Sequence, residues 1–173
     1  RAETVRIVGR GTDLTLGLAG RTAQVDDGHF NMPGGEFFYS PLEDATEGVI
    51  EYSEFPAVYM GHLVDGVRLR FVGGKVVDAS ARSHEDFLLR TLGADEGARR
   101  LGELGIGCNP GITQHTRDTL FDEKIDGTVH LAVGAGFPFL GSRNTSTVHW
   151  DMVKDLRSEG QLFCDGELVQ ENG

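Results

Sequence analysis

The sequence predicts an α+β domain built mainly from antiparallel or mixed β-sheet, with a few short helices. Segments that alternate apolar and polar residues recur on both sides of the centre of the chain, which is typical of half-buried strands. The 25 glycines among 173 residues separate these segments with turns. Segments with helical spacing fall mainly in the region 83–123, between the two groups of strands.

The length allows one domain with a substantial core, because a domain of about 150 residues buries roughly 70% of its unfolded surface. We therefore expect residues 1–173 to form a single domain. The formal charge of −11 and the pI near 4.9 argue against nucleic acid and membrane partners. Two cysteines, no membrane-spanning apolar run and no signal-peptide pattern favour a cytoplasmic protein. Because the sequence begins at Arg1 and not at Met, we expect a segment of a longer protein.

Strands are expected wherever β-type residues alternate between turn residues. The pairs Asp65-Gly66 and Gly73-Gly74 are typical of hairpin turns, and Asp165-Gly166 predicts a final hairpin. The expected strands are 4–8, 13–18, 49–52, 58–60, 67–72, 75–77, 161–164 and 167–170.

Two helices are expected between these groups of strands. Ser83, with Asp86 three residues later, resembles an N-terminal cap, and the apolar stripe that follows ends at Gly93. The second helix is expected over 95–104. It would place Glu103 near a helix C-terminus, where the helix dipole disfavours an anion. Glu103 would then need a nearby cation, although an exposed Glu on a short helix is the simpler interpretation.

The stretch 147–153 carries the most specific chemistry. Side chains two residues apart on a strand point to the same face, so His149 and Asp151 lie side by side and Trp150 faces the opposite way. A neutral nitrogen ligand beside an anionic oxygen ligand is half of a transition-metal site. Such a pair alone is more often a surface pair, so the other candidate ligands decide between the two interpretations.

Further candidates are spread along the chain. Glu36 follows a Pro-Gly-Gly turn and enters an aromatic run, where a carboxylate is costly unless it is paired or bound to a metal. His130 is a lone imidazole in the strand-like segment 128–134, a position more often taken by a hydrogen-bonded core residue. Cys108 is expected to be a buried structural thiol, and His115 a surface residue. Glu43, in an acidic loop, is a candidate to support the ligands.

Four motifs, taken in this order, resemble the C-terminal domain of the thermophilic metallo-aminopeptidase family, the leucyl aminopeptidase-like aminopeptidase T and aminopeptidase S type. They are Asn-Met-Pro-Gly-Gly-Glu at 31–36, Leu-Gly-Glu at 101–103, His-Leu-Ala-Val-Gly at 130–134 and His-Trp-Asp-Met at 149–152. The resemblance covers nearly the whole chain. It implies that the metal ligands are Glu36, Glu103, His130, His149 and Asp151.

The same resemblance implies hydrolysis of the N-terminal peptide bond by a metal-activated water at a site with two divalent ions, zinc, cobalt or manganese. Two ions about 3.5–4 Å apart can share ligands and clamp a substrate, whereas five protein ligands exceed what one zinc uses. Without metal, the carboxylates of Glu36, Glu103 and Asp151 would repel one another. The family tyrosine that assists catalysis corresponds to Phe137, which has no hydrogen-bonding group, so no catalytic side chain is assigned.

The resemblance also implies a homodimer of two-domain subunits, with the N-terminal domain absent from this chain and a peptide or small-molecule substrate. A domain cut from a larger enzyme should expose apolar surface, for which Phe37, Phe38 and Phe55 are the candidates.

Two other functions are compatible with the residues. In a mononuclear Fe(II) ring-cleaving dioxygenase of the dihydroxypyridine dioxygenase type, His130, His149 and Asp151 would supply the ligands. Glu36 and Glu103 have no role in such a site, which favours the hydrolase. In a non-catalytic dimerisation or binding module the site would have decayed, but all five ligand types are present.

Overall fold

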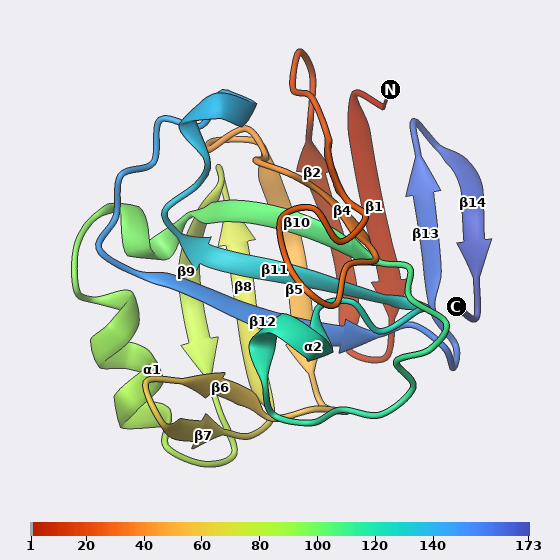
Figure 1. The fold of residues 1–173 in the computed structure, drawn as a ribbon. Coiled ribbons are helices and arrows are strands. Elements are labelled where there is room, and N and C mark those ends of the chain that lie inside the picture. The colour runs from red at the N-terminus through yellow and green to blue at the C-terminus, as the bar shows by residue number, and fades with distance from the viewer. Residues whose placement is uncertain (1) are drawn as a thin grey trace.

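Two antiparallel sheets pack against each other in the computed structural model, which describes residues 2–173 (Figure 1). The larger sheet contains β1 (Thr4–Gly9), β2 (Thr12–Gly17), β5 (Thr46–Tyr52), β8 (Val67–Val72), β9 (Lys75–Ser80), β13 (Gln161–Cys164) and β14 (Glu167–Glu171), in the spatial order β14-β13-β1-β2-β5-β8-β9. The smaller sheet contains β3 (Gln24–Asp26), β4 (Glu36–Tyr39), β10 (Leu101–Gly107), β11 (Thr128–Gly134) and β12 (His149–Asp155), in the order β12-β11-β10-β4-β3. In Figure 1 the strands β10, β11 and β12 cross the strands of the larger sheet at a steep angle.

Short elements complete the fold. The strands β6 (Ala57–Tyr59) and β7 (His62–Val64) form a separate two-stranded ribbon. The α-helices are α1 (Glu85–Leu92) and α2 (Thr119–Asp122), and the 3-10 helices are η1 (Gly97–Arg99) and η2 (Pro138–Leu140). The predicted α+β class is confirmed, because antiparallel sheet dominates and both α-helices fall within 83–123. Among residues 2–173, no helix is long and apolar enough to cross a membrane.

The hydrophobic core lies between the two sheets. Strand alternation sends every second side chain of β10, β11 and β12 into it: Leu104, Leu131, Val133, Trp150 and Met152 belong to one buried cluster with side chains of the larger sheet. Trp150 is fully buried and stacks on Tyr59 with ring centroids 5.2 Å apart. The alternate residues of the same three strands therefore face away from this core, on the outer side of the smaller sheet.

The helix predicted over 95–104 is wrong. After the single turn of η1, residues Leu101–Gly107 form β10, a strand buried at all seven positions. Its three glycines allow neighbouring groups to approach the backbone closely. Because both faces of this central strand are buried, its sequence lacks the alternation of apolar and polar residues that indicates a half-buried strand. Glu103 consequently lies on a strand and not at a helix end.

The first predicted helix is confirmed as α1, and it ends at Gly93 as expected. The expected cap at Ser83 is wrong, since the N-cap residue is His84, which makes no capping hydrogen bond with its side chain. The Ser83 hydroxyl accepts a hydrogen bond from the Asp65 backbone N–H instead.

The prediction that Phe37, Phe38 and Phe55 form exposed apolar surface is also wrong. Phe38 is buried, Phe37 packs against the core, and the Phe55 ring stacks on His115 with centroids 4.5 Å apart. The large apolar side chains that are most exposed are Phe30, Met32, Met60 and Phe139.

Candidate metal centre

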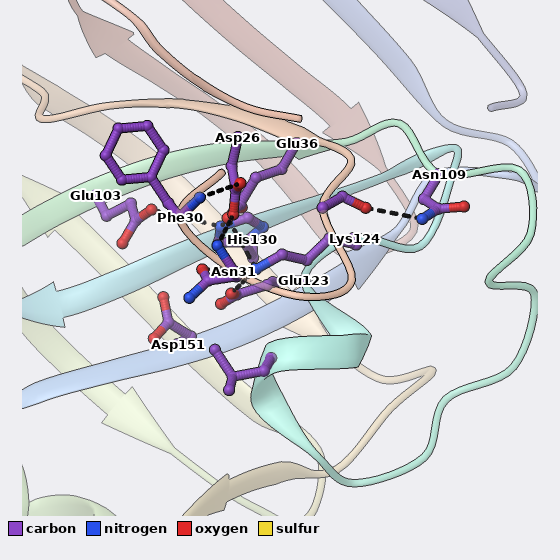
Figure 2. Close-up of polar contacts among 12 residues, drawn as sticks. Asp26, Phe30, Asn31, Glu36, Glu103, Asn109, Glu123, Lys124, His130 and Asp151 are labelled. Atoms are coloured by element: carbon purple, nitrogen blue, oxygen red, sulfur yellow. Dashed lines mark hydrogen bonds and ion pairs between the residues drawn. The ribbon is translucent and has the colours of Figure 1, made fainter. Parts of the chain in front are cut away.

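Four strands of the smaller sheet bring all five predicted ligands together. Glu36 begins β4, Glu103 lies on β10, His130 on β11, and His149 and Asp151 on β12. The register pairs Gly107 with Glu36, Gly105 with His130 and Ala132 with Asp151, so these positions share the outer face of the sheet. Figure 2 shows the side chains of Glu36, Glu103, His130 and Asp151 converging above the strands. The prediction that His149 and Asp151 point away from Trp150 is confirmed.

Two features of β10 make room for this arrangement. The register shifts between Leu101 and Glu103, so Glu103 lies opposite Ala132 and faces the same side as His130. Gly105 lies opposite His130, and a Cβ atom at Gly105 would overlap the His130 imidazole. The bulge therefore orients the carboxylate, and the glycine leaves space for the ring.

Glu103 connects the two histidines. Its Oε1 atom lies 3.6 Å from His130 Nε2, and its Oε2 atom lies 3.2 Å from His149 Nε2. Glu36 Oε2 lies 3.1 Å from His130 Nε2, and Asp151 Oδ2 lies 3.3 Å from His149 Nε2. On the far side of the His149 ring, Nδ1 lies 2.8 Å from the Ala135 carbonyl oxygen. A hydrogen bond to this carbonyl would place the proton on Nδ1 and leave Nε2 free for a metal.

Several buried polar atoms of the cluster have no hydrogen-bond partner. They are Glu36 Oε2, both ring nitrogens of His130, and Asp151 Oδ1. Such atoms cost free energy when buried unless a cation or another partner meets them. Their donor types, carboxylate oxygen and imidazole nitrogen, suit a divalent transition metal.

The donor atoms are close enough to share metal ions. Three sets each bring one atom per residue within 4.8 Å of one another: Glu36 with Glu103 and His130, Glu103 with His149 and Asp151, and Glu123 with His130 and Asp151. Glu103 is common to the first two sets. The residues present therefore fit a metal centre with a shared carboxylate.

The mutual repulsion expected among the carboxylates without metal is offset by neighbouring cations. Burial opposes ionisation of Glu36 and Glu103, but contacts with His130 hold the pKa of both carboxyl groups below the usual range. Burial likewise opposes the charge on His149, but Asp151 and Glu103 raise the pKa of this imidazole to about 11. Burial opposes the charge on His130 as well, but Glu103 and Glu36 raise the pKa of this imidazole well above its usual value. Protons on both histidines therefore offset part of the carboxylate charge when no metal is bound.

Sequence reasoning missed two buried charged residues between α2 and β11. The Lys124 ammonium is fully buried, with its Nζ atom 3.0 Å from Glu36 Oε1, and it also forms an ion pair with Glu123. Burial raises the pKa of Glu123 to about 7, and the carboxylates of Glu36 and Asp151 act in the same direction. The available signal was the run Asp122-Glu123-Lys124 just before a histidine-bearing strand, but such runs usually form solvated turns.

Three other expectations need correction or a new role. Cys108 is exposed and not a buried thiol. The His115 side chain is only 11% exposed, and its Nε2 atom lies 3.1 Å from Asp122 Oδ2, so it is not a surface residue. Glu43 binds the Arg21 guanidinium at 2.8 Å and accepts a hydrogen bond from the Arg143 backbone N–H. Glu43 therefore fixes the loop after η2. Its side-chain hydrogen bonds and ion pair go to this loop and to Arg21, and not to the five ligands.

Phe137 forms an aromatic wall beside His149. Its ring centroid lies 5.6 Å from that of His149, with the planes at 62°, and 5.1 Å from that of Phe38. The Ser40 hydroxyl accepts a hydrogen bond from the Phe137 backbone N–H, which fixes the segment that carries the ring.

Known proteins are similar to this chain in sequence. The sequence model described as thermophilic metalloprotease (M29) matches residues 1–168. Aminopeptidase T of Thermus aquaticus is 37% identical over 152 residues, which are 79% of this chain and 36% of that protein. Aminopeptidase AmpS of Bacillus subtilis (strain 168) is 34% identical over 168 residues, which are 90% of this chain and 40% of that protein. The chain thus spans well under half the length of these curated relatives.

Two solved structures have the same fold. Wild-type AmpT from Thermus thermophilus superposes with a TM-score of 0.81 at 29% identity, covering 98% of this chain and 50% of the other. The 2,5-dihydroxypyridine dioxygenase of Pseudomonas putida KT2440 superposes with a TM-score of 0.83 at 16% identity, covering 99% and 54%. At that lower identity the second likeness shows a common fold and nothing about chemistry.

Proposed function

The chain belongs to the thermophilic metalloprotease family (M29), and on that premise we propose that residues 1–173 form the metal-binding catalytic domain of a metal-dependent aminopeptidase. The proposal rests on one observation: Glu36, Glu103, His130, His149 and Asp151 converge on one face of a sheet and leave buried donor atoms without partners. The N-terminal domain of such an enzyme would lie outside this chain.

We propose two divalent ions, zinc, cobalt or manganese, held by two ligand sets that share Glu103. Glu36 and His130 would complete one set, and His149 and Asp151 the other. The opposite directions of the two Glu103 oxygens, one toward each histidine, support this sharing. When bound, such ions lower the pKa of water and polarise a peptide carbonyl group.

Three residues at the centre have proposed roles in substrate approach, substrate contact and proton transfer. His149, with 35% of its side chain exposed, is the most accessible ligand and marks the side from which a peptide would approach. Phe137 lies on that side and offers an apolar surface to the substrate. Glu123, whose pKa burial raises to about 7, can hold or release a proton near neutral pH.

The test combines metal content with activity. We expect elemental analysis of the purified protein to find zinc, cobalt or manganese, and we expect amino-acid p-nitroanilides to be hydrolysed only by the loaded protein. His149→Ala should lose both properties. His62→Ala, which removes an exposed imidazole from β7, should keep both. A protein that binds no divalent metal would contradict the proposal.

A mononuclear iron dioxygenase receives less support from the geometry. Each of the three metal-binding sets in the described chain includes a glutamate, and none consists of His130, His149 and Asp151. Elemental analysis that finds one iron and no other metal would reverse this preference.

We also propose a homodimer. Phe30, Met32 and Phe139 are 65%, 82% and 64% exposed, and a second subunit that covered these large apolar side chains would remove them from water. Sedimentation that finds only monomer at micromolar concentration would contradict the dimer.

A further inference from the structure

We propose that Lys124 is a built-in counter-cation of the metal centre, which competes with the ion on the Glu36 side and makes the two metal positions unequal in affinity. The inference rests on the two-ion site proposed above. It concerns a lysine, which is not one of the five proposed metal ligands.

The Lys124 ammonium is locked in place by three oxygen-bearing side chains. Nζ lies 3.0 Å from Glu36 Oε1 and 3.2 Å from Asn31 Oδ1, and it forms an ion pair with Glu123. The Lys124 side chain is fully buried, so water cannot replace these partners. Figure 2 shows this ammonium among the carboxylates, on the side of the centre next to Glu36. A lysine is rarely buried in this way unless it is paired.

The loop that carries Asn31 is also fixed. Asp26 is buried and accepts hydrogen bonds from the backbone N–H groups of Phe30 and Asn31 at 3.3 and 3.0 Å. These bonds hold Asn31 over Lys124. The ammonium therefore cannot swing away to make room for a metal without breaking an ordered loop.

The charges explain why such a cation is present. Glu36, Glu103, Glu123 and Asp151 bring four carboxylates into one buried cluster. Among residues 2–173, Lys124 is the only lysine or arginine that forms an ion pair with any of them. It therefore supplies positive charge that stays in the centre whether or not a metal is bound.

The position of Lys124 makes this charge asymmetric. It engages Glu36 Oε1 and leaves Oε2, which faces His130, as the free oxygen of that carboxylate. The set of Glu103, His149 and Asp151 contains no residue that Lys124 binds. Repulsion between the ammonium and a dication is thus strongest at the Glu36 position, where the two share a ligand.

A structural role and a competing role predict opposite effects of removing the charge. If Lys124 only orders Glu36 and Glu123, then Lys124→Met should scatter these carboxylates and weaken metal binding. If Lys124 competes with the metal, the same change should tighten the weaker binding step, because it removes the repulsion and leaves two carboxylates in need of a cation.

Calorimetric titration of Zn²⁺ into the metal-free protein separates the two roles. We expect two unequal steps in the wild type, and tightening of the weaker step by about tenfold or more in Lys124→Met. Lys124→Arg keeps the charge and should keep the unequal steps. Metal-free Lys124→Met should melt below the wild type and gain more from Zn²⁺. A folded Lys124→Met whose weaker step is unchanged or weakened would overturn the inference.

Three other results would also test the role of Lys124. If metal-free Lys124→Met does not fold, Zn²⁺ should restore folding by supplying the missing charge, and failure to do so while Lys124→Arg folds would overturn the inference. Absence of Zn²⁺ binding in the wild type would overturn both the metal centre and the role of Lys124. The wild type could bind Zn²⁺ in two unequal steps, with the weaker step tightened in Lys124→Met, and still show no peptidase activity. That result would support the role of Lys124 and contradict only the aminopeptidase.

Discussion

Gly105 and His130 face each other on neighbouring strands so closely that the imidazole occupies the space of the missing Gly105 side chain. The ring therefore packs against the Gly105 backbone, fully buried, with Nε2 between Glu36 and Glu103. A residue without a side chain is thus part of what positions a metal ligand.

Gly105→Ala should displace His130 from the centre. A methyl group forced into this contact should lower the free energy of unfolding by about 1–3 kcal/mol, and it should weaken metal binding because Nε2 moves. Thermal melting and calorimetric titration measure the two effects. Gly9→Ala in β1 is the matched control, because its new Cβ would meet only ordinary contacts, the nearest at 3.5 Å. Wild-type metal affinity in Gly105→Ala would contradict the geometry.

His149→Ala and Asp151→Ala should each abolish tight metal binding, because both belong to the set shared with Glu103. Trp150, between them in sequence, faces the core and should behave differently. Trp150→Phe should lower stability through lost packing on Tyr59 and leave metal stoichiometry unchanged. Elemental analysis and melting curves on the three variants separate ligands from packing. A metal-depleted Trp150→Phe variant would contradict the placement of Trp150 on the opposite face of β12 from His149 and Asp151.

The contrast between these three residues shows what the sequence could predict. Period-two alternation was enough to place His149, Trp150 and Asp151, because it depends only on local backbone geometry. Glu103 required a register shift in β10, which depends on pairing with β11 and leaves no local pattern. Lys124 lies in a turn that looks solvated, and its burial results from the 27–35 loop folding over it, a contact across 93 residues of sequence.

Metal binding should release protons and strengthen as the pH rises. In the metal-free protein the pKa of His149 is about 11, so its ring is protonated at neutral pH and must lose a proton to bind a metal. The apparent affinity should increase about tenfold per pH unit for each proton released, up to that pKa. Titrations in buffers with different ionisation enthalpies count the protons. Binding heats that do not depend on the buffer would contradict protonated histidines.

The metal-free protein should lose stability in alkali. Because the folded pKa of His149 lies above its unfolded value near 6.5, the imidazolium contributes stability that is complete below about pH 6.5 and is lost as the pH rises toward 11. Bound metal should counter this loss, and adds about 2.7 kcal/mol at a free concentration of 100 times the dissociation constant. Melting curves with chelator and with added zinc, at pH 7 and pH 9.5, measure both effects. A melting temperature that ignores chelator and metal at both pH values would contradict the metal centre.

Phe137→Tyr should increase peptidase activity. The Phe137 ring lies beside His149, the most exposed of the candidate ligands, yet it offers no group that could stabilise charge developing on a peptide carbonyl. Removing one such donor from an active site costs about 10²–10³ in rate, so adding a hydroxyl here should raise kcat by up to that factor and leave KM nearly constant. Phe139→Tyr is the control, because the Phe139 ring is 64% exposed and packs against Phe137, with centroids 5.5 Å apart, and not against His149. Equal gains in both variants would show that added polarity, and not a hydroxyl beside His149, is responsible.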